Sequence, residues 1–248
     1  MIDIHAHIMP GIDDGAASMA ETLVMLRTAA ENGVHTIVAT PHCNAENFYE
    51  NYYDKYYMAL FDKLVAEAEA ENIPVKILPG MEVFADENIL ELVKQGRVIT
   101  LGGSRYILIE FGIGKDLALI DFITDELLAM GYVPVIAHPE RYPYVQRAPH
   151  MAGKWLKSGC LLQANKGSIL GAFGRHAQNA ALYMLEHNMI SFIASDAHGA
   201  LHRTTDLSGV FDFICSNYSL EMAYMLLEDN PAKLIENREL SELKLMLG

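Results

Sequence analysis

Short runs of apolar residues alternate with longer stretches of helical periodicity along the whole chain. The runs are rich in Val, Ile and Leu with little polar alternation, which is typical of parallel strands buried on both faces. Repeated βα units of this length predict a parallel barrel or a doubly wound sheet. The seven predicted strands span residues 2–7, 36–42, 75–82, 106–111, 133–140, 161–165 and 190–198.

Helix signals fill the stretches between the predicted strands. The first helix is expected to start at Ser18, with Glu21 placed as in a capping box, and to stop at Gly33. The polar, tyrosine-rich segment 43–56 reads either as a loop over the mouth of a site or as the exposed start of a helix. The other predicted helices span 52–71, 86–95, 117–130, 175–188 and a tail over 205–237 whose last piece opens at Asn230-Pro231.

Composition and charge narrow the class of protein. The chain has 248 residues, of which 51% are hydrophobic, and no linker is evident, so one domain over 1–248 is expected. The formal net charge of −14 argues against bulk binding to nucleic acid or to an anionic membrane, and no apolar run is long enough for membrane insertion. An anionic substrate stays compatible with this charge, because bound metal ions reverse the local sign.

The three cysteines and the start of the chain predict a cytoplasmic protein. Cys43, Cys160 and Cys215 are odd in number, far apart and form no CxxC pair, which is typical of reduced thiols. The apolar start is short, lacks a basic region and carries histidines, so no signal peptide is predicted.

Six of the seven predicted strands end in a histidine or a carboxylate. In a βα barrel the strand ends converge on one mouth, so these side chains are expected to share a cavity. That many buried polar groups are costly unless they are paired, and metal ions are the natural compensation. The residues, in strand order, are His5 and His7, His42, Glu82, Glu110, His138, and Asp196 and His198; Asp14 follows the first strand, and the sixth ends in Gln163 and Asn165.

The other histidines are expected to be structural or exposed. Four of them lie beside a strand or in helices and their flanks: His35, His150, His176 and His187. His202 follows the last strand-end group and is close enough in sequence to approach the mouth, although loops near a site are often uninvolved.

The strand-end motifs carry a specific family resemblance. HAH, DDG, TPH, a strand-end Glu, IEF, AHPER and SDAH resemble, in this order, the motifs of the PHP (polymerase and histidinol phosphatase) superfamily. Within it, MIDIHAHI, ATPH, LPGMEV, YILIEF, PVIAHPERY and IASDAH look like the bacterial metal-dependent protein-tyrosine phosphatases of capsule and exopolysaccharide operons. The segment 43–75 and the tail after about residue 203 match less clearly.

The resemblance implies an α/β fold of PHP type, a distorted (β/α)7 barrel, with three divalent metal ions. It assigns His5, His7, Glu82 and Asp196 to one ion, Glu82, Glu110 and His138 to a second, and Asp14, His42 and His198 to the third. Of the DDG pair, Asp14 rather than Asp13 is assigned. The donor types permit manganese, iron, cobalt or zinc, and the resemblance favours manganese.

The predicted function is hydrolysis of phosphotyrosine. A metal-bound hydroxide would attack phosphorus, and the planar fork of Arg141 suits bidentate contact with the phosphate oxygens. Against three divalent ions the four carboxylates leave two positive charges by formal count, which a phosphate dianion neutralises. The segment Phe48–Tyr57 could line the mouth and stack on the substrate ring. By resemblance, the natural partner is a bacterial tyrosine kinase that controls polysaccharide export.

Several alternatives remain open at this point. Histidinol-phosphate hydrolysis would use the same metals, whereas an amidohydrolase commonly needs a strand-end lysine, which no predicted strand has. A nuclease fits poorly with the net charge, and a metal-binding regulator with a dead site fits poorly with a complete ligand set. Lys166, Gly167 and Ser168 read as a plain turn or as an anion-binding nest.

A cysteine mechanism of the common tyrosine-phosphatase kind is not supported. Such a site needs an arginine six residues after the nucleophilic thiol. The residues found at that distance after the three cysteines are Tyr49, Lys166 and Glu221.

Overall fold

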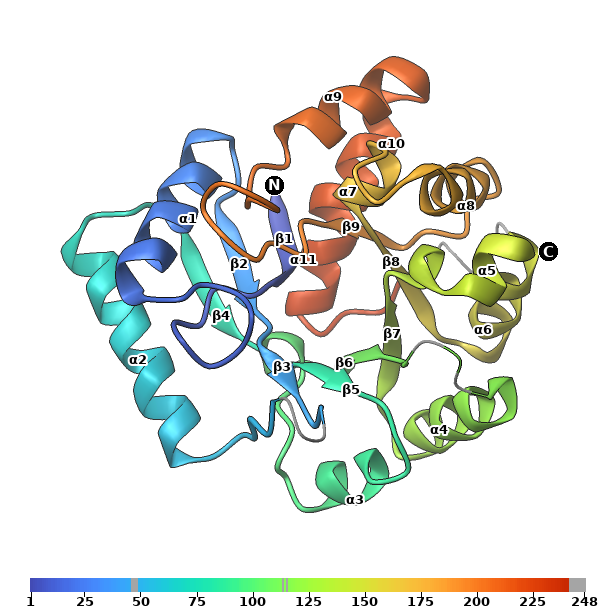
Figure 1. The fold of residues 1–248 in the computed structure, drawn as a ribbon, viewed down its shortest axis with the longest axis horizontal. Coiled ribbons are helices and arrows are strands. Elements are labelled where there is room, and N and C mark those ends of the chain that lie inside the picture. The colour runs from blue at the N-terminus through green and yellow to red at the C-terminus, as the bar shows by residue number, and fades with distance from the viewer. Residues whose placement is uncertain (46–48, 113, 115, 241–248) are drawn as a thin grey trace.

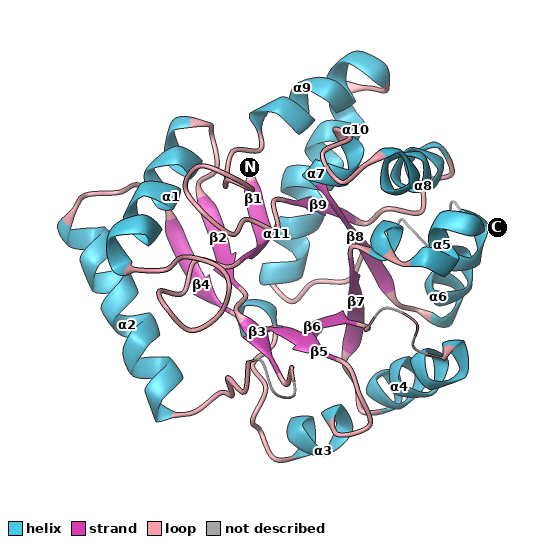
Figure 2. Cartoon of the chain, viewed as in Figure 1, coloured by secondary structure: helices cyan, strands magenta, loops and turns pink. Residues whose placement is uncertain are grey.

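Parallel strands form a ring, and most of the helices pack around its outside (Figure 1, Figure 2). The computed structural model describes residues 1–45, 49–112, 114 and 116–240. Neighbouring strands pair in parallel, in one sheet of order β1-β2-β4 and another of order β3-β5-β6-β7-β8-β9. Within the described residues the strands are β1 (Ile2–Ala6), β2 (Thr36–Ala39), β3 (His42–Cys43), β4 (Lys76–Pro79), β5 (Glu82–Phe84), β6 (Tyr106–Glu110), β7 (Val133–Ala137), β8 (Leu161–Asn165) and β9 (Phe192–Ala194).

Two of the predicted strands are each divided into two, which corrects the sequence prediction. The run 36–42 becomes β2 and β3, and the run 75–82 becomes β4 and β5. The breaks fall at Pro41, which has no N–H for a strand ladder, and at Gly80. A Cβ added at Gly80 would lie 2.7 Å from Cγ1 of Val38, so only glycine allows this close approach. The second halves carry His42 and Glu82 into the larger sheet, where they face each other in register.

Backbone contacts join β1 to the segment that follows β9. The amide of Asp196 donates to the carbonyl of His5 at 2.8 Å, and the amide of His7 donates to the carbonyl of Ala197 at 2.9 Å. A parallel bridge between Ala6 and Ala197 lies at the same place. These contacts join the two sheets beside β1 and β9, and the α/β arrangement of parallel strands agrees with the distorted barrel that the resemblance implied.

The long helices agree with the predicted ones, with trimmed ends. Ser18 caps the first helix by accepting from the Glu21 amide at 3.3 Å, and Asp54 caps the second, which begins at Lys55 rather than at residue 52. Short helices after β7 and β8 were not predicted, because four to six residues are too few to show a helical period. The α-helices are α1 (Met19–Glu31), α2 (Lys55–Ala70), α3 (Ile89–Lys94), α4 (Leu117–Ala129), α5 (Pro143–Arg147), α6 (Gly153–Ser158), α7 (Lys166–Ile169), α8 (Arg175–Glu186), α9 (Ser208–Asn217), α10 (Leu220–Tyr224) and α11 (Asn230–Ile235).

Alternation along the strands separates a small apolar core inside the ring from a larger one between the strands and the helices. On β6, Tyr106 and Leu108 belong to the small cluster, whereas Ile107 and Ile109 belong to the large one. The same alternation turns Glu110, the next residue, toward the inside. Residues from the turn Leu101–Gly103 and from α11 complete the small cluster, which fills the ring below the strand ends. The carboxyl ends are thus left to polar side chains.

No helix within the described ranges is long and apolar enough to cross a membrane.

Candidate metal centre

Three groups of histidines and carboxylates lie together at the carboxyl ends of the strands. Within each group, the possible ligand atoms all lie within 4.8 Å of one another. His7, His42 and Glu82 each belong to two of the groups, so the three groups form one continuous centre. The groups are His5, His7, Glu82 and Asp196; His42, Glu82 and Glu110; and His7, Asp14, His42 and His198.

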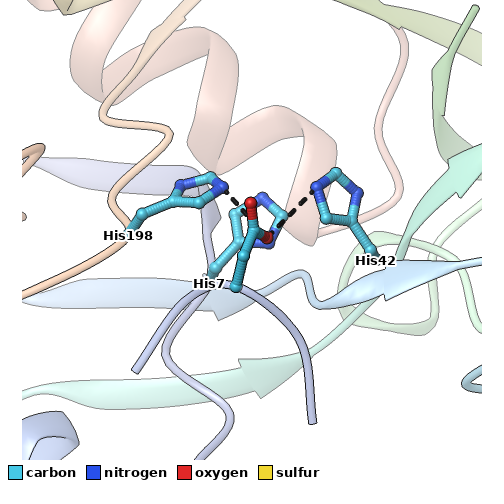
Figure 3. A group of neighbouring side chains, drawn as sticks. His7, His42 and His198 are labelled. Carbon is cyan, nitrogen blue, oxygen red and sulfur yellow. Dashed lines mark ion pairs between the residues drawn. The ribbon is translucent and has the colours of Figure 1, made fainter. Parts of the chain in front are cut away.

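All nine residues that the sequence assigned to metal binding therefore lie at this centre or directly against it. His138 lies outside the groups but joins the second one, because its Nε2 is 2.9 Å from Glu82 Oε1 and 3.8 Å from Glu110 Oε1. Figure 3 shows His7, His42 and His198 turned toward one another, and Asp14 Oδ1 lies 3.5 Å from Nε2 of both His42 and His198. Asp14, and not Asp13, occupies the third group.

The buried carboxylate of Glu82 is the centre of this arrangement. Its Oε2 makes no hydrogen bond, although Nε2 of His5 and Nε2 of His7 lie 3.2 and 3.1 Å away. These two ring nitrogens also face each other at 3.2 Å. Buried polar atoms that converge without pairing need another partner, and a divalent cation bound by imidazole and carboxylate satisfies them all. The residues present thus fit a metal ion.

The pKa shifts of the carboxylates also agree with a bound cation. Burial, together with the neighbouring charge of Glu82, raises the pKa of Glu110 to about 8. Burial alone would also raise the pKa of Asp196, but His5, His138 and Arg203 outweigh it and hold the pKa well below its ordinary value. Crowded carboxylates of this kind are stabilised in their ionised form by added positive charge.

Neighbouring polar residues fix the orientation of the histidines and carboxylates in these groups. His7 Nδ1 lies 2.8 Å from Asp13 Oδ2, and His5 Nδ1 lies 2.8 Å from Gln163 Oε1. The side-chain amide of Gln163 donates to Asn165 Oδ1 at 2.9 Å. The side-chain amide of Asn165 in turn donates to Asp196 Oδ2 at 2.5 Å. The sixth predicted strand, which lacks an ionisable residue at its end, thus supplies the orienting amides instead.

Two ligand-type residues sit where the backbone turns out of a strand. His138 and Asp196 have φ angles of 34° and 49°, in the left-handed region that non-glycine residues rarely adopt. These turns end β7 and β9 earlier than the sequence predicted and point both side chains into the centre. Such outliers cluster at functional sites, because the surrounding structure must hold them in place.

Gly15 of the DDG motif packs directly against the HAH strand. A Cβ added here would lie 2.2 Å from the carbonyl oxygen of His7 and 2.4 Å from its Cβ. These are atoms of the backbone and of the side-chain root, so they cannot rotate away. The loop that carries Asp14 can therefore reach the centre only with glycine at this position.

Gly15→Ala is expected to push the DDG loop away from His7 and to weaken metal binding at the third group. Overpacking of this kind costs about 1–3 kcal/mol of stability. Bound metal per chain and the melting temperature measure both effects. Gly209→Ala is the matched control, because its Cβ would meet only Leu170 Cδ1, at 3.8 Å. Equal metal content in the two variants would contradict this account of the motif.

Two arginines lie beside the centre, and only one of them was predicted. Arg141 Nη1 is 3.3 Å from Asp196 Oδ2, and Arg203 Nη2 is 2.5 Å from the same oxygen. Arg203 was not predicted, because it lies in a loop five residues beyond His198 and carries no periodic signal. The guanidinium groups of both also lie over the ring of Phe173, with Cζ 5.1 and 5.5 Å from its centroid.

The loop that carries Arg203 is anchored from two sides. The ammonium of Lys166 donates to the carbonyls of Thr204 and Asp206, and Thr205 Oγ1 donates to the Met25 carbonyl at 2.5 Å. Lys166 thus holds a loop in place, and α7 rather than a plain turn follows β8.

The remaining histidines lie away from the three groups. His202 is exposed and belongs to none of them. The other four are exposed as well: His35, which pairs with Glu228, His150, His176 and His187.

The tyrosine-rich segment contacts the centre at His42, whose carbonyl accepts from the side-chain amide of Asn51 at 3.0 Å. The ring of Tyr49 stacks on that of His42, with centroids 5.5 Å apart. Tyr57 is buried in α2, and its hydroxyl donates to the Gly80 carbonyl at 2.8 Å. Phe48, the other end of the segment expected at the mouth, lies outside the described residues.

The described cysteines do not suit a thiolate mechanism. All three are free, and burial raises the pKa of Cys43 and that of Cys160 to about 12. A thiol with such a pKa is protonated at neutral pH and is a poor nucleophile.

Fold and centre together are those of a metal-dependent hydrolase, with histidines and carboxylates that could hold metal ions at the strand ends. The family model described as "Capsular polysaccharide synthesis, CpsB/CapC" matches residues 1–236. The chain belongs to this CpsB/CapC family.

Named relatives extend over nearly the whole chain. The tyrosine-protein phosphatase YwqE of Bacillus subtilis is 34% identical over 238 residues, covering 96% of this chain and 92% of the relative. The tyrosine-protein phosphatase CpsB of Streptococcus pneumoniae is 30% identical over 240 residues, covering 95% and 98%. The resemblance drawn from the motifs is therefore confirmed.

Solved structures agree with the sequence relatives. A structure from work on YwqE and CpsB, described there as unique metal-dependent tyrosine phosphatases, superposes with a TM-score of 0.90 at 33% identity, covering 96% of each chain. A lactonase from Listeria monocytogenes superposes with a TM-score of 0.59 at 11% identity, covering 96% and 95%, which shows a shared fold alone.

Proposed function

We propose that this chain is a metal-dependent protein-tyrosine phosphatase that acts through three divalent ions. The observation that carries the proposal is the continuous centre around Glu82, flanked by two arginines that meet at Asp196. The relatives that match nearly the whole chain in sequence bear the same activity in their names. The functional unit proposed is one domain over 1–248.

The proposed ligand sets follow the three groups. His5, His7, Glu82 and Asp196 would hold one ion, Glu82, Glu110 and His138 a second, and Asp14, His42 and His198 the third. When bound, the ions would polarise phosphate oxygens and lower the pKa of water to near neutrality. Manganese is proposed as the metal, and iron, cobalt and zinc accept the same imidazole and carboxylate donors.

The chain's own residues would bind and orient the phosphate. Arg141 and Arg203 present planar forks that match two phosphate oxygens, and both lie at the rim of the centre. Asp196 holds the two guanidinium groups close together, with its Oδ2 between them. A phenolate leaves readily, so a strong general acid is not required of the protein.

The proposed substrate is a phosphotyrosine protein, specifically a bacterial tyrosine kinase that controls polysaccharide export. The family's place in capsular polysaccharide synthesis supports this partner. The cytoplasmic location expected from the thiols stays a prediction.

Turnover of matched peptides tests the substrate. Peptides that differ only in carrying phosphotyrosine, phosphoserine or phosphothreonine are offered to the metal-loaded protein, and histidinol phosphate is offered in parallel. Phosphotyrosine is expected to be hydrolysed much faster than the other three. Equal rates on the peptides, or a preference for histidinol phosphate, would assign the chain to a different phosphoesterase activity.

A further inference from the structure

An aromatic groove of about 440 Å³ opens beside the metal centre. Its volume is in the range of about 300–1,000 Å³ that is typical of small-molecule sites. Glu110 belongs to both the groove and the centre, and His138 and Arg141, which contact Glu82 and Asp196 of the centre, also line the groove, so the two are continuous. The other lining residues on the described chain are Phe84, Phe111, Gly112, Tyr142, Gln146, Phe173 and Ala177.

Phe173 is the link between the groove and the two arginines. Its ring carries the guanidinium groups of Arg141 and Arg203, 5.1 and 5.5 Å from the centroid. Gly167 leaves the space for this ring, because an added Cβ would lie 2.7 Å from Phe173 Cε2. A phosphate that both guanidinium groups hold would therefore sit next to Phe173, with its ester oxygen free to point along the groove.

The lining of the groove combines two kinds of side chain. Glu110, His138 and Arg141 are charged or polar, whereas Phe84, Phe111, Tyr142 and Phe173 are aromatic. Phe111 and Tyr142 are buried, while Phe84 and Phe173 are partly exposed. A ligand with an anionic head and a flat apolar body matches this combination of groups.

We infer that the groove holds the phenyl ring of the phosphotyrosine, with Phe84 and Phe173 as its walls, and so selects aryl over alkyl phosphates. The inference rests on the proposed function, because the phosphate must sit at the metal centre. Aromatic rings pair favourably with centroids about 4.5–7 Å apart, and a phosphoserine side chain offers no ring to do so. The selectivity therefore comes from two apolar side chains that take no part in metal binding.

Binding of two phosphonates tests the groove without turnover. Phenylphosphonate and methylphosphonate carry the same charged head, and titration calorimetry on the manganese-loaded protein gives both dissociation constants. The wild type is expected to prefer the phenyl compound by about tenfold or more. Phe84→Ala and Phe173→Leu are each expected to remove most of this preference, whereas Phe173→Tyr, which keeps the ring, retains it.

The controls distinguish the loss of a groove side chain from general effects of a substitution. Phe122→Ala changes an exposed phenylalanine on α4 and is expected to keep the full preference. Metal content and circular dichroism report whether each variant is folded, and Phe84→Ala decides the matter if Phe173→Leu does not fold. An undiminished phenyl preference in folded variants, or none in the wild type, overturns the inference.

Failure of the groove and failure of the proposed function give different results. A wild type that prefers phenylphosphonate but hydrolyses no phosphotyrosine supports the groove and refutes the function. A wild type that hydrolyses phosphotyrosine, with a preference unaltered by both substitutions, supports the function and refutes the groove.

Discussion

Glu82→Gln is expected to release metal from the centre and to lower phosphotyrosine hydrolysis by about 10³-fold or more. Glu82 lies within 3.2 Å of ring nitrogens from His5, His7 and His42, and it belongs to two of the three ligand groups. Glutamine keeps the shape but removes the charge and one of the two acceptor oxygens. The loss corresponds to several kcal/mol of transition-state stabilisation, which is the contribution expected of bound metal.

Metal analysis and kinetics on the same preparations measure this effect. The wild type purified without chelator should hold more than one divalent ion per chain, and Glu82→Gln distinctly fewer. Excess chelator should inactivate the wild type, and manganese should be among the ions that restore it. Glu126→Gln, on the exposed face of α4, is the control with unchanged metal and turnover. Full activity of the wild type in excess chelator would exclude a metal mechanism.

The fold was predictable because each strand is recognisable from its own stretch of sequence. Buried parallel strands read as continuous apolar runs, and all seven runs fall on strands of the ring. The divided strands were harder, since Pro41 and Gly80 signal a break but do not show that the halves join different sheets. That outcome depends on the distance between Gly80 and Val38, which only packing sets.

The ligand-type residues were predictable for a related reason. A strand-end position in a parallel ring determines which end of the barrel a side chain occupies, whatever the strand's neighbours are. Glu110 shows this most simply, because the alternation of Tyr106 and Leu108 on β6 already points it inward. The motifs then restricted the chemistry to histidine and carboxylate.

The residues that orient the metal-type side chains could not be predicted from the sequence in this way. Asp13 and Gln163 orient His7 and His5 by hydrogen bonds that follow from the three-dimensional positions of separate segments. Arg203 reaches the centre because Lys166 tethers its loop from another part of the chain. Neither spacing nor hydrophobic pattern shows which atoms these side chains contact, so the sequence predicted the metal-type residues but not the residues that orient them.

Removing both arginines is expected to be the second largest loss of activity. Arg141→Ala and Arg203→Ala should each lower kcat/KM for a phosphotyrosine peptide by about 10²-fold, as for the loss of one transition-state donor. The double variant should lose less than the product of the two, because both guanidinium groups share Asp196 and the face of Phe173. Arg141→Lys should recover only part of the rate, since an ammonium cannot make the bidentate contact.

Metal content separates this effect from damage to the centre. Neither arginine belongs to the three ligand groups, so each variant should keep the bound metal of the wild type. Arg27→Ala, which breaks an exposed ion pair with Glu71, is the matched control and should leave kcat/KM unchanged. If Arg203→Ala keeps wild-type kinetics while Arg141→Ala does not, the phosphate contacts Arg141 alone and Arg203 serves only to hold Asp196. If the losses of the two single variants multiply, the arginines act on separate parts of the substrate rather than on one phosphate.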